Sequence, residues 1–179
     1  MTPCLNPPVS DRDHCRGGRD GAVTLVQFGD YECPHCVVAH VILRRIEYLL
    51  GSRLRFVFRN SPMERHPTAL SAAIIAEAAA FQGRFWEMHD RLYESEETLE
   101  NEVLARYAAE LGLDLTRLRA DTHAAGARVR EDIASARSSG VIETPTFFVN
   151  GLRYDGNWRD EAGFLAMLER ASRGAPLPA

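Results

Sequence analysis

The fold of this chain is decided by Val23-Thr24-Leu25-Val26-Gln27-Phe28-Gly29-Asp30-Tyr31-Glu32-Cys33-Pro34-His35-Cys36. The first six residues are mostly apolar, which predicts a strand buried on both faces. After a turn at Gly29-Asp30, the two cysteines open a segment whose apolar residues recur at helical spacing. These residues are Val38, Val41, Ile42, Ile46 and Leu49. Two thiols separated by two residues at a strand-to-helix junction are typical of reversible dithiol and disulfide chemistry.

The order of residues in the CxxC motif predicts a different role for each. Cys33 is expected to be exposed at the helix N-terminus, where unpaired backbone N–H groups and the helix dipole favour a thiolate. Pro34 suits the first helical turn because it has no N–H to leave unpaired. We therefore predict Cys33 as the attacking sulfur and Cys36, one turn further on, as the resolving sulfur. His35 lowers the pKa of Cys33 further if its ring is charged or donates a hydrogen bond to the thiolate.

The composition suits one globular domain with room for a large insertion, because 179 residues that are 45% hydrophobic can bury a sizeable core. Acidic and basic residues are interspersed and the net charge is -4, so no basic patch predicts binding to nucleic acid or to an anionic membrane. The sequence has no phosphate-binding loop, dinucleotide fingerprint or nucleophile elbow, and we expect no cofactor.

The first ten residues have no basic segment followed by an apolar stretch, and no apolar run in the chain is long enough to cross a bilayer. We therefore expect a cytoplasmic protein. In a reducing compartment, a CxxC pair is more often catalytic or metal-binding than a structural disulfide.

The order of expected elements is β-α-β, a helical insertion, then β-β-α, which places the chain in the α/β class. A second central strand is expected at Leu54–Phe58, a hairpin at Thr146–Val149 and Leu152–Tyr154 around the turn Asn150-Gly151, and a closing helix at Asp160–Ala171. The expected organisation is an irregular N-terminal arm at 1–20, a core formed by 21–61 and 140–173, and an inserted helical subdomain at 62–139.

A zinc site is the main chemical alternative for the cysteine pair, because CxxC supplies two tetrahedral ligands and His35 or His40 could add a third. Cys4 and Cys15 have ten residues between them in the irregular arm and make a poor second half of such a site. We therefore favour redox chemistry and expect no metal. Cys4 and Cys15 could instead pair with each other, serve as extra resolving thiols or be incidental.

With these motifs identified, the chain resembles the DsbA-like thiol:disulfide oxidoreductases of the thioredoxin-fold superfamily, most of all the subgroup that lacks a signal peptide. The resemblance runs from about Val9 to Leu168. It rests on the opening stretch quoted above, on Phe85-Trp86-Glu87-Met88-His89-Asp90, and on Thr144-Pro145-Thr146-Phe147-Phe148-Val149-Asn150-Gly151.

The resemblance implies a thioredoxin fold with an inserted helical subdomain, Cys33 as nucleophile and Cys36 as resolving thiol. It also implies a cis Thr144-Pro145 bond that faces the sulfurs, although an X-Pro bond without other information is cis only about 5% of the time. The loop at Thr144 and Pro145 would bind an incoming peptide by strand addition.

Two residues near the motifs depart from the family pattern, and a third is a candidate neighbour of the site. Gln27 stands where relatives commonly have a buried glutamate that relays a proton to the resolving thiol, and Gln27 cannot ionise. Glu143 replaces a common glycine before Thr144-Pro145 and would place a carboxylate at the rim of the site. Glu32, directly before Cys33, is the third candidate.

The sequence therefore predicts a thiol-disulfide oxidoreductase that acts on thiol- or disulfide-containing proteins or on low-molecular-weight thiols. A redox sensor or adaptor that uses the same CxxC without multiple turnover is the alternative from a different class. A disulfide isomerase, which usually needs a second module, and a zinc-binding module are weaker alternatives.

Overall fold

The structure is a computed structural model that describes residues 4–176, and within them a five-stranded sheet is combined with six α-helices. The strands are β1 (His14–Gly17), β2 (Val23–Gly29), β3 (Leu54–Asn60), β4 (Thr146–Val149) and β5 (Leu152–Tyr154). The helices are α1 (Pro34–Leu50), α2 (Ala69–Ala80), α3 (Phe85–Tyr93), α4 (Asn101–Glu110), α5 (Leu115–Ser138) and α6 (Glu161–Ala171). The predicted α/β class is confirmed, and the predicted elements occur in the predicted order after an additional strand, β1.

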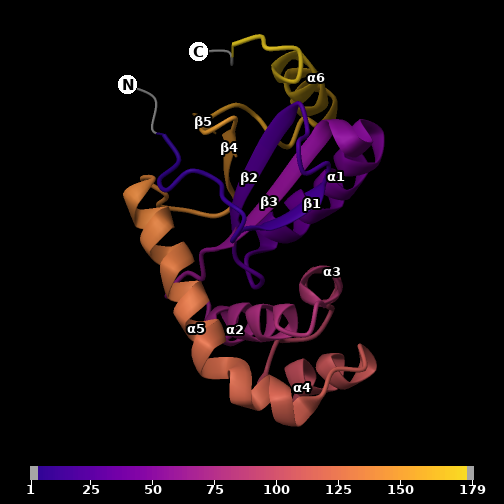
Figure 1. Cartoon of the computed structure of the whole chain (residues 1–179), viewed down its shortest axis with the longest axis vertical. Helices are drawn as coiled ribbons and strands as arrows, with labels where there is room; N and C mark the ends of the chain where they lie inside the picture. Colours follow the sequence, from indigo (N-terminus) through magenta and orange to yellow (C-terminus); the bar gives the residue numbers. More distant parts are fainter. Residues whose placement is uncertain (1–3, 177–179) are drawn as a thin grey trace.

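The sheet has the strand order β1-β3-β2-β4-β5, in which β2 and β3 are parallel and the other neighbours are antiparallel. Helices α2 to α5 interrupt the chain between β3 and β4, and α5 runs back from the helical end to the sheet (Figure 1). Because β2 lies at the centre of the sheet, the CxxC motif that follows it is held at the middle of one sheet edge.

Alternate side chains of the central strands are buried on opposite faces of the sheet. On one face Leu25 and Phe147 pack with α1 and α6, and the rings of Phe147 and Phe164 lie 5.4 Å apart. On the other face Val26 and Phe148 pack against Leu5 of the N-terminal arm and against the end of α5. The prediction of a strand buried on both faces is therefore confirmed for β2.

The β4–β5 hairpin has the predicted bounds and the predicted turn. Asn150 and Gly151 both have positive φ, 50° and 83°, as a two-residue type I′ turn requires. Glycine tolerates this region without strain and asparagine does so better than most residues, which explains why the turn could be located from the sequence.

The predicted apolar stripe of α1 is partly wrong. Val38, Val41 and Leu49 are 47%, 49% and 52% exposed. The helix instead buries the face that carries Cys36, Ala39, His40, Ile42, Leu43, Ile46 and Leu50. Helical spacing alone could not distinguish between the two apolar faces of α1. The face that packs into the core is the one that carries Cys36.

The N-terminal arm is also more regular than expected, because β1 pairs with the edge of β3 in the register His14↔Phe58 and Cys15↔Val57. The segment has no alternation of apolar and polar residues, so its pairing depends on the exposed edge of β3 rather than on a local pattern. Residues 1–3 of the predicted arm lie outside the described residues. The predicted bounds of the helical insertion, 62–139, remain a prediction.

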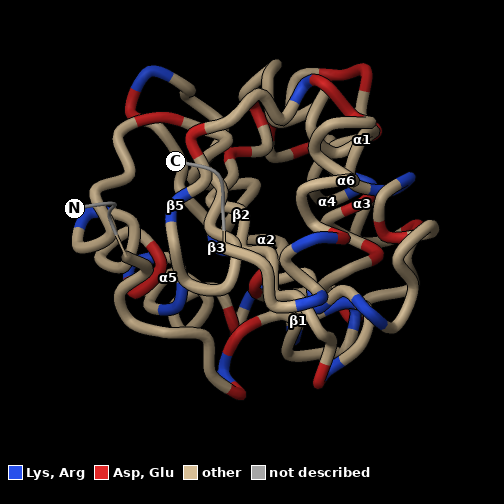
Figure 2. Tube along the Cα trace, turned by 90° about the horizontal axis from the view of Figure 1, so that it is seen from above, with Lys and Arg blue, Asp and Glu red and all other residues tan. Residues whose placement is uncertain are grey.

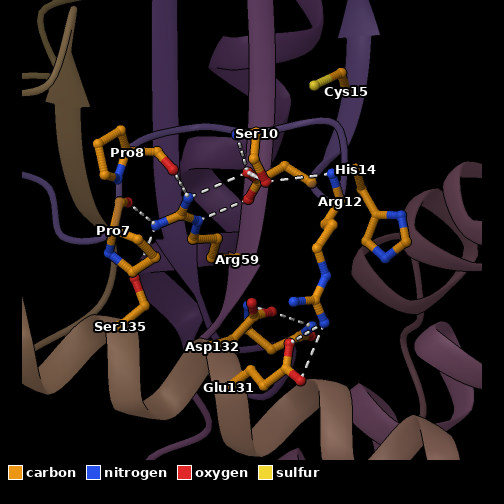
Figure 3. Close-up of polar contacts among 12 residues, drawn as sticks. Pro7, Pro8, Ser10, Arg12, His14, Cys15, Arg59, Glu131, Asp132 and Ser135 are labelled. Carbon is orange, nitrogen blue, oxygen red and sulfur yellow. Dashed lines mark hydrogen bonds and ion pairs between the residues drawn. The ribbon is translucent and has the colours of Figure 1, made fainter.

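The buried side chain of Arg59 in β3 forms hydrogen bonds with the N-terminal arm and with α5 (Figure 3). Its Nε donates to Asp13 Oδ1 at 2.8 Å, and Nη1 donates to the Pro7 carbonyl at 2.9 Å and to Ser135 Oγ of α5 at 2.8 Å. Nη2 donates to the Pro8 carbonyl at 3.2 Å. The buried guanidinium is thus neutralised and hydrogen-bonded, which links the arm, β3 and α5.

Acidic and basic residues are interspersed along the chain in the view of Figure 2. Some form ion pairs between elements, such as Arg45–Glu161 at 3.0 Å between α1 and α6, and Arg91–Glu110 at 3.2 Å between α3 and α4. Within residues 4–176, no helix combines the length and the apolarity needed to span a membrane.

We expect Arg59→Leu to lower the free energy of unfolding by about 3 kcal/mol or more, because it leaves the buried Asp13 carboxylate without its cation. The matched control is Arg12→Leu, which removes an ion pair to Glu131 whose side chains are 70% and 49% exposed. This control should cost less than about 1 kcal/mol. Urea unfolding followed by circular dichroism measures both changes, and equal losses would contradict the proposed anchoring role of Arg59.

Candidate active site

The turn between β2 and α1 is organised by Asp30, which is buried. Its carbonyl accepts the Cys33 N–H at 3.2 Å, and its Oδ1 accepts the Glu32 N–H at 2.8 Å. Its Oδ2 accepts the Met63 N–H at 2.8 Å and lies 2.8 Å from His66 Nδ1. Asp30 therefore fixes the CxxC loop against the segment that follows β3.

Sequence reasoning did not select Asp30 as a site residue. An aspartate directly after a strand often accepts the N–H two residues later in an Asx turn, and that signal was present in Gly29-Asp30. The additional bonds to Met63 and His66 could not be predicted, because they join segments more than 30 residues apart in the chain.

Cys33 is the N-cap residue of α1 and has extended backbone angles, φ -76° and ψ 118°. Its carbonyl accepts the N–H groups of Cys36 at 2.9 Å and Val37 at 3.1 Å, and Pro34 occupies the first turn. The predicted position of Cys33 at the helix N-terminus is confirmed. The predicted exposure is wrong, because Cys33 is only 1% exposed.

The cover over Cys33 comes from the loop before β4. In its protonated form the Cys33 thiol donates a hydrogen bond to the Thr144 carbonyl, with Sγ and O 3.3 Å apart. The Thr144-Pro145 bond is cis, as the family resemblance implies. The hydroxyl Oγ1 of Thr144 is buried and has no hydrogen-bond partner among the described residues. The loop thus contributes a polar wall to the cysteine pair.

The two thiols differ strongly in acidity. The hydrogen bond from the Cys36 thiol lowers the pKa of Cys33 from 9.0 to about 5. Burial acts against this shift, and the N–H groups of Cys36 and His35 assist it. Burial raises the pKa of Cys36 well above its usual value, and the hydrogen bond to Cys33 adds to this effect. At neutral pH the reduced pair therefore consists of a Cys33 thiolate and a Cys36 thiol, and the two titrate as a unit.

His35 is exposed, and the hydrogen bond of its ring among the described residues is to Arg159 rather than to a cysteine sulfur. Its Nδ1 lies 2.8 Å from Arg159 Nη2 and accepts that hydrogen bond, while the guanidinium of Arg159 lies 4.2 Å from the ring centre of Trp158. The contribution of His35 to the acidity of Cys33 comes from its backbone N–H.

The three other residues considered near the site, Glu32, Glu143 and Gln27, differ in burial and in hydrogen bonding. The Glu32 carboxylate accepts the N–H and the hydroxyl of Thr68 at 2.8 and 2.9 Å, just before α2 begins, so it joins the motif to the helical segment. Glu143 is exposed at the rim. Gln27 is buried in β2 on the face of Leu25, and its Nε2 has no hydrogen-bond partner among the described residues.

Cys4 and Cys15 lie near opposite edges of the sheet. Cys15 belongs to β1, whereas Cys4 forms an isolated bridge with Leu152 of β5. The two edge strands of this sheet are four strand spacings apart, which is about 19 Å. This distance is too long for a disulfide between Cys4 and Cys15 or for one metal ion bound by both. The considered pairing of Cys4 with Cys15 is therefore wrong for this structure.

The thioredoxin family model matches residues 10–169. The chain belongs to the thioredoxin family. Its fold is that of the DsbA-like thiol-disulfide oxidoreductases, as two solved structures illustrate. A thioredoxin-like oxidoreductase from Silicibacter pomeroyi is 28% identical, with a TM-score of 0.82 over 93% of this chain and 95% of that one. Oxidised BdbD from Bacillus subtilis is 23% identical, with a TM-score of 0.83 over 97% of this chain and all of that one.

Curated relatives of this thioredoxin-family chain carry the name of a transporter. Na⁺/H⁺ antiporter NhaA 3 of Salinispora tropica is 46% identical over 162 residues, which are 87% of this chain and 24% of that protein. Na⁺/H⁺ antiporter NhaA of Herminiimonas arsenicoxydans is 43% identical over 173 residues, 95% of this chain and 27% of that protein. The chain spans about a quarter of the length of these relatives, and the antiport in their names is a property of the much longer proteins.

We expect the thiolate absorbance of the reduced protein to rise with a midpoint near pH 5, because the Cys36 thiol stabilises the Cys33 anion. In Cys36→Ala the midpoint should move up toward the ordinary pKa of a cysteine, 9.0. An ultraviolet pH titration measures both values, with Cys33→Ala as the blank for other thiols. An unchanged midpoint in Cys36→Ala would contradict this account of the acidity.

Proposed function

We propose that this protein is a thiol-disulfide oxidoreductase that exchanges disulfides with proteins or low-molecular-weight thiols through Cys33 and Cys36. The observation that carries the proposal is the unequal acidity of the two thiols at the start of α1, with the pKa of Cys33 at about 5 and that of Cys36 raised. An attacking thiol must be ionised, whereas a resolving thiol must remain protonated until a mixed disulfide has formed.

In the reductive direction, the Cys33 thiolate attacks one sulfur of a substrate disulfide. The substrate S–S bond breaks, its other sulfur leaves as a thiolate and takes up a proton, and Cys33 is left in a mixed disulfide. Cys36 then loses its proton and attacks the Cys33 sulfur, which releases the second substrate thiolate and forms the Cys33–Cys36 disulfide. A dithiol or two molecules of a small thiol must return the two electrons; in the oxidative direction every step reverses.

Substrate access requires the cover over Cys33 to open locally. The surface around it is formed by exposed Pro34 and His35 on one side and by exposed Ile142 and Glu143 before the cis loop on the other. We propose that the backbone at Thr144 and Pro145 pairs with an incoming peptide in place of its present contact with the thiol. Gln27 cannot accept the proton from Cys36, so that proton passes to water or to a departing thiolate.

A redox sensor that changes state without multiple turnover is the second candidate, and the 1% exposure of Cys33 favours it. A sensor tolerates slow access of a substrate to Cys33, whereas an efficient catalyst does not.

The cytoplasmic location remains a prediction. The direction of net electron flow would follow from the thiol redox potential of the compartment together with the potential of the Cys33–Cys36 pair.

We expect Cys33→Ser to abolish the reduction of insulin by dithiothreitol, because no nucleophile remains, and Cys36→Ser to accumulate mixed disulfides visible by mass spectrometry. Cys15→Ser is the matched control and should retain activity. Retained turnover in Cys33→Ser would overturn the proposal. A wild-type protein that consumes a single equivalent of reductant and then stops would favour the sensor.

A further inference from the structure

A second cluster of ligating side chains lies between α1 and α3, away from the thiols. One potential ligand atom from each of His40, His89 and Asp90 lies within 4.8 Å of the others, and among residues 4–176 this is the one such group of three. His40 comes from α1, whereas His89 and Asp90 come from α3. Neither cysteine of the CxxC motif belongs to the group.

His40 points an unused nitrogen into this cluster. Its side chain is 6% exposed, and Nε2 is buried with no hydrogen-bond partner within residues 4–176. The nearest acidic oxygens are Asp90 Oδ1 at 4.0 Å and Glu94 Oε1 at 3.9 Å, both beyond hydrogen-bonding distance. A buried polar atom is normally paired, so an unpaired nitrogen that faces two carboxylates indicates that a partner is absent.

From these positions we propose a zinc site in which His40, His89, Asp90 and Glu94 supply the ligands. Two imidazoles and two carboxylates are a ligand set that suits Zn²⁺. In a tetrahedral zinc site, neighbouring ligand atoms are about 3.3 Å apart. The ligand atoms of His40, His89, Asp90 and Glu94 must therefore move closer to one another by roughly 1 Å. Glu94, whose side chain is 64% exposed, is free to approach His40, whereas the contraction among His40, His89 and Asp90 requires their own side chains to move.

Two tyrosines hold the rings of His40 and His89 in fixed orientations, as the ligands of a metal site require. The Tyr31 hydroxyl lies 3.1 Å from Nδ1 of His89, and the ring of Tyr93 stacks on His40 at 5.1 Å. These contacts fix both rings, as the outer shell of a metal site does.

The charges near the cluster leave a net negative site. Arg16 donates to both oxygens of Asp90 at 2.8 and 2.9 Å, and Arg44 lies 3.9 Å from the same carboxylate. Glu47 balances Arg16 with an ion pair at 2.6 Å. The carboxylate of Glu94, 3.9 Å from the His40 ring, adds a further negative charge. Glu94 and Asp90 also lie one helical turn apart, on the same face of α3 and its C-terminal cap.

A metal ion at this place would join α1, which begins at the thiols, to the helical segment between β3 and β4. His40 follows Cys36 by four residues, which is one turn of the same helix. The site would therefore stabilise the contact between the two parts of the molecule, whether or not the cysteines exchange disulfides.

The test uses the full chain with Cys33→Ser and Cys36→Ser, which removes zinc binding by the thiol pair. Calorimetric titration with ZnCl₂ should show one equivalent of tight binding, and zinc should raise the thermal midpoint. Adding His40→Gln or Glu94→Gln should weaken binding at least about tenfold. Glu94→Gln changes an exposed side chain and keeps the test valid if His40→Gln folds poorly.

His123→Gln is the matched control, since this exposed histidine of α5 lies outside the cluster and its loss should leave the affinity unchanged. The proposal is overturned if the serine double variant takes up no zinc. It is equally overturned if Glu94→Gln and His40→Gln bind as tightly as their parent, or if His123→Gln loses as much affinity as they do.

Discussion

The antiparallel pairing of β2 with β4 is the constraint on which the candidate site depends. The register Phe28↔Thr146 places the end of β2 beside the start of β4, although the two residues are 118 positions apart in the chain. The turn that follows β2 carries Cys33, and the loop that precedes β4 carries Thr144. Their hydrogen bond at 3.3 Å is a direct consequence of this pairing, and so is the polar wall beside the sulfurs.

Acidity and burial act against each other at Cys33. Burial in the protein raises the pKa of a thiol, yet the pKa of Cys33 is lowered, because hydrogen bonds from the Cys36 thiol and from two backbone N–H groups outweigh the burial. The same enclosure that concentrates these donors leaves little of the sulfur accessible. The low pKa of Cys33 and its burial are therefore two results of the same arrangement.

The helical segment is tied to the sheet by buried polar contacts in addition to apolar packing. Asn60 at the end of β3 donates from its side-chain amide to Glu77 of α2 at 2.7 Å and to Asp132 of α5 at 3.0 Å. Burial, together with the nearby Glu77, raises the pKa of Asp132 to about 6. Glu32 adds a further link, from the cysteine loop to the start of α2. The turn that carries Cys33 is thus held by contacts with the helical segment as well as with the sheet.

The sequence by itself determined the local elements and the reactive motif. The CxxC at a strand-to-helix junction, the bounds of β4 and the turn at Asn150-Gly151 were predictable, because turn chemistry and apolar periodicity act over a few neighbouring residues. The cis Thr144-Pro145 bond followed only from the family resemblance. Tertiary structure alone decided the burial of Cys33, the strand at His14–Gly17, the part played by Asp30 and the meeting of His40 with α3. Each of these depends on contacts between segments far apart in the chain, and no local pattern of residues encodes which distant group will lie opposite.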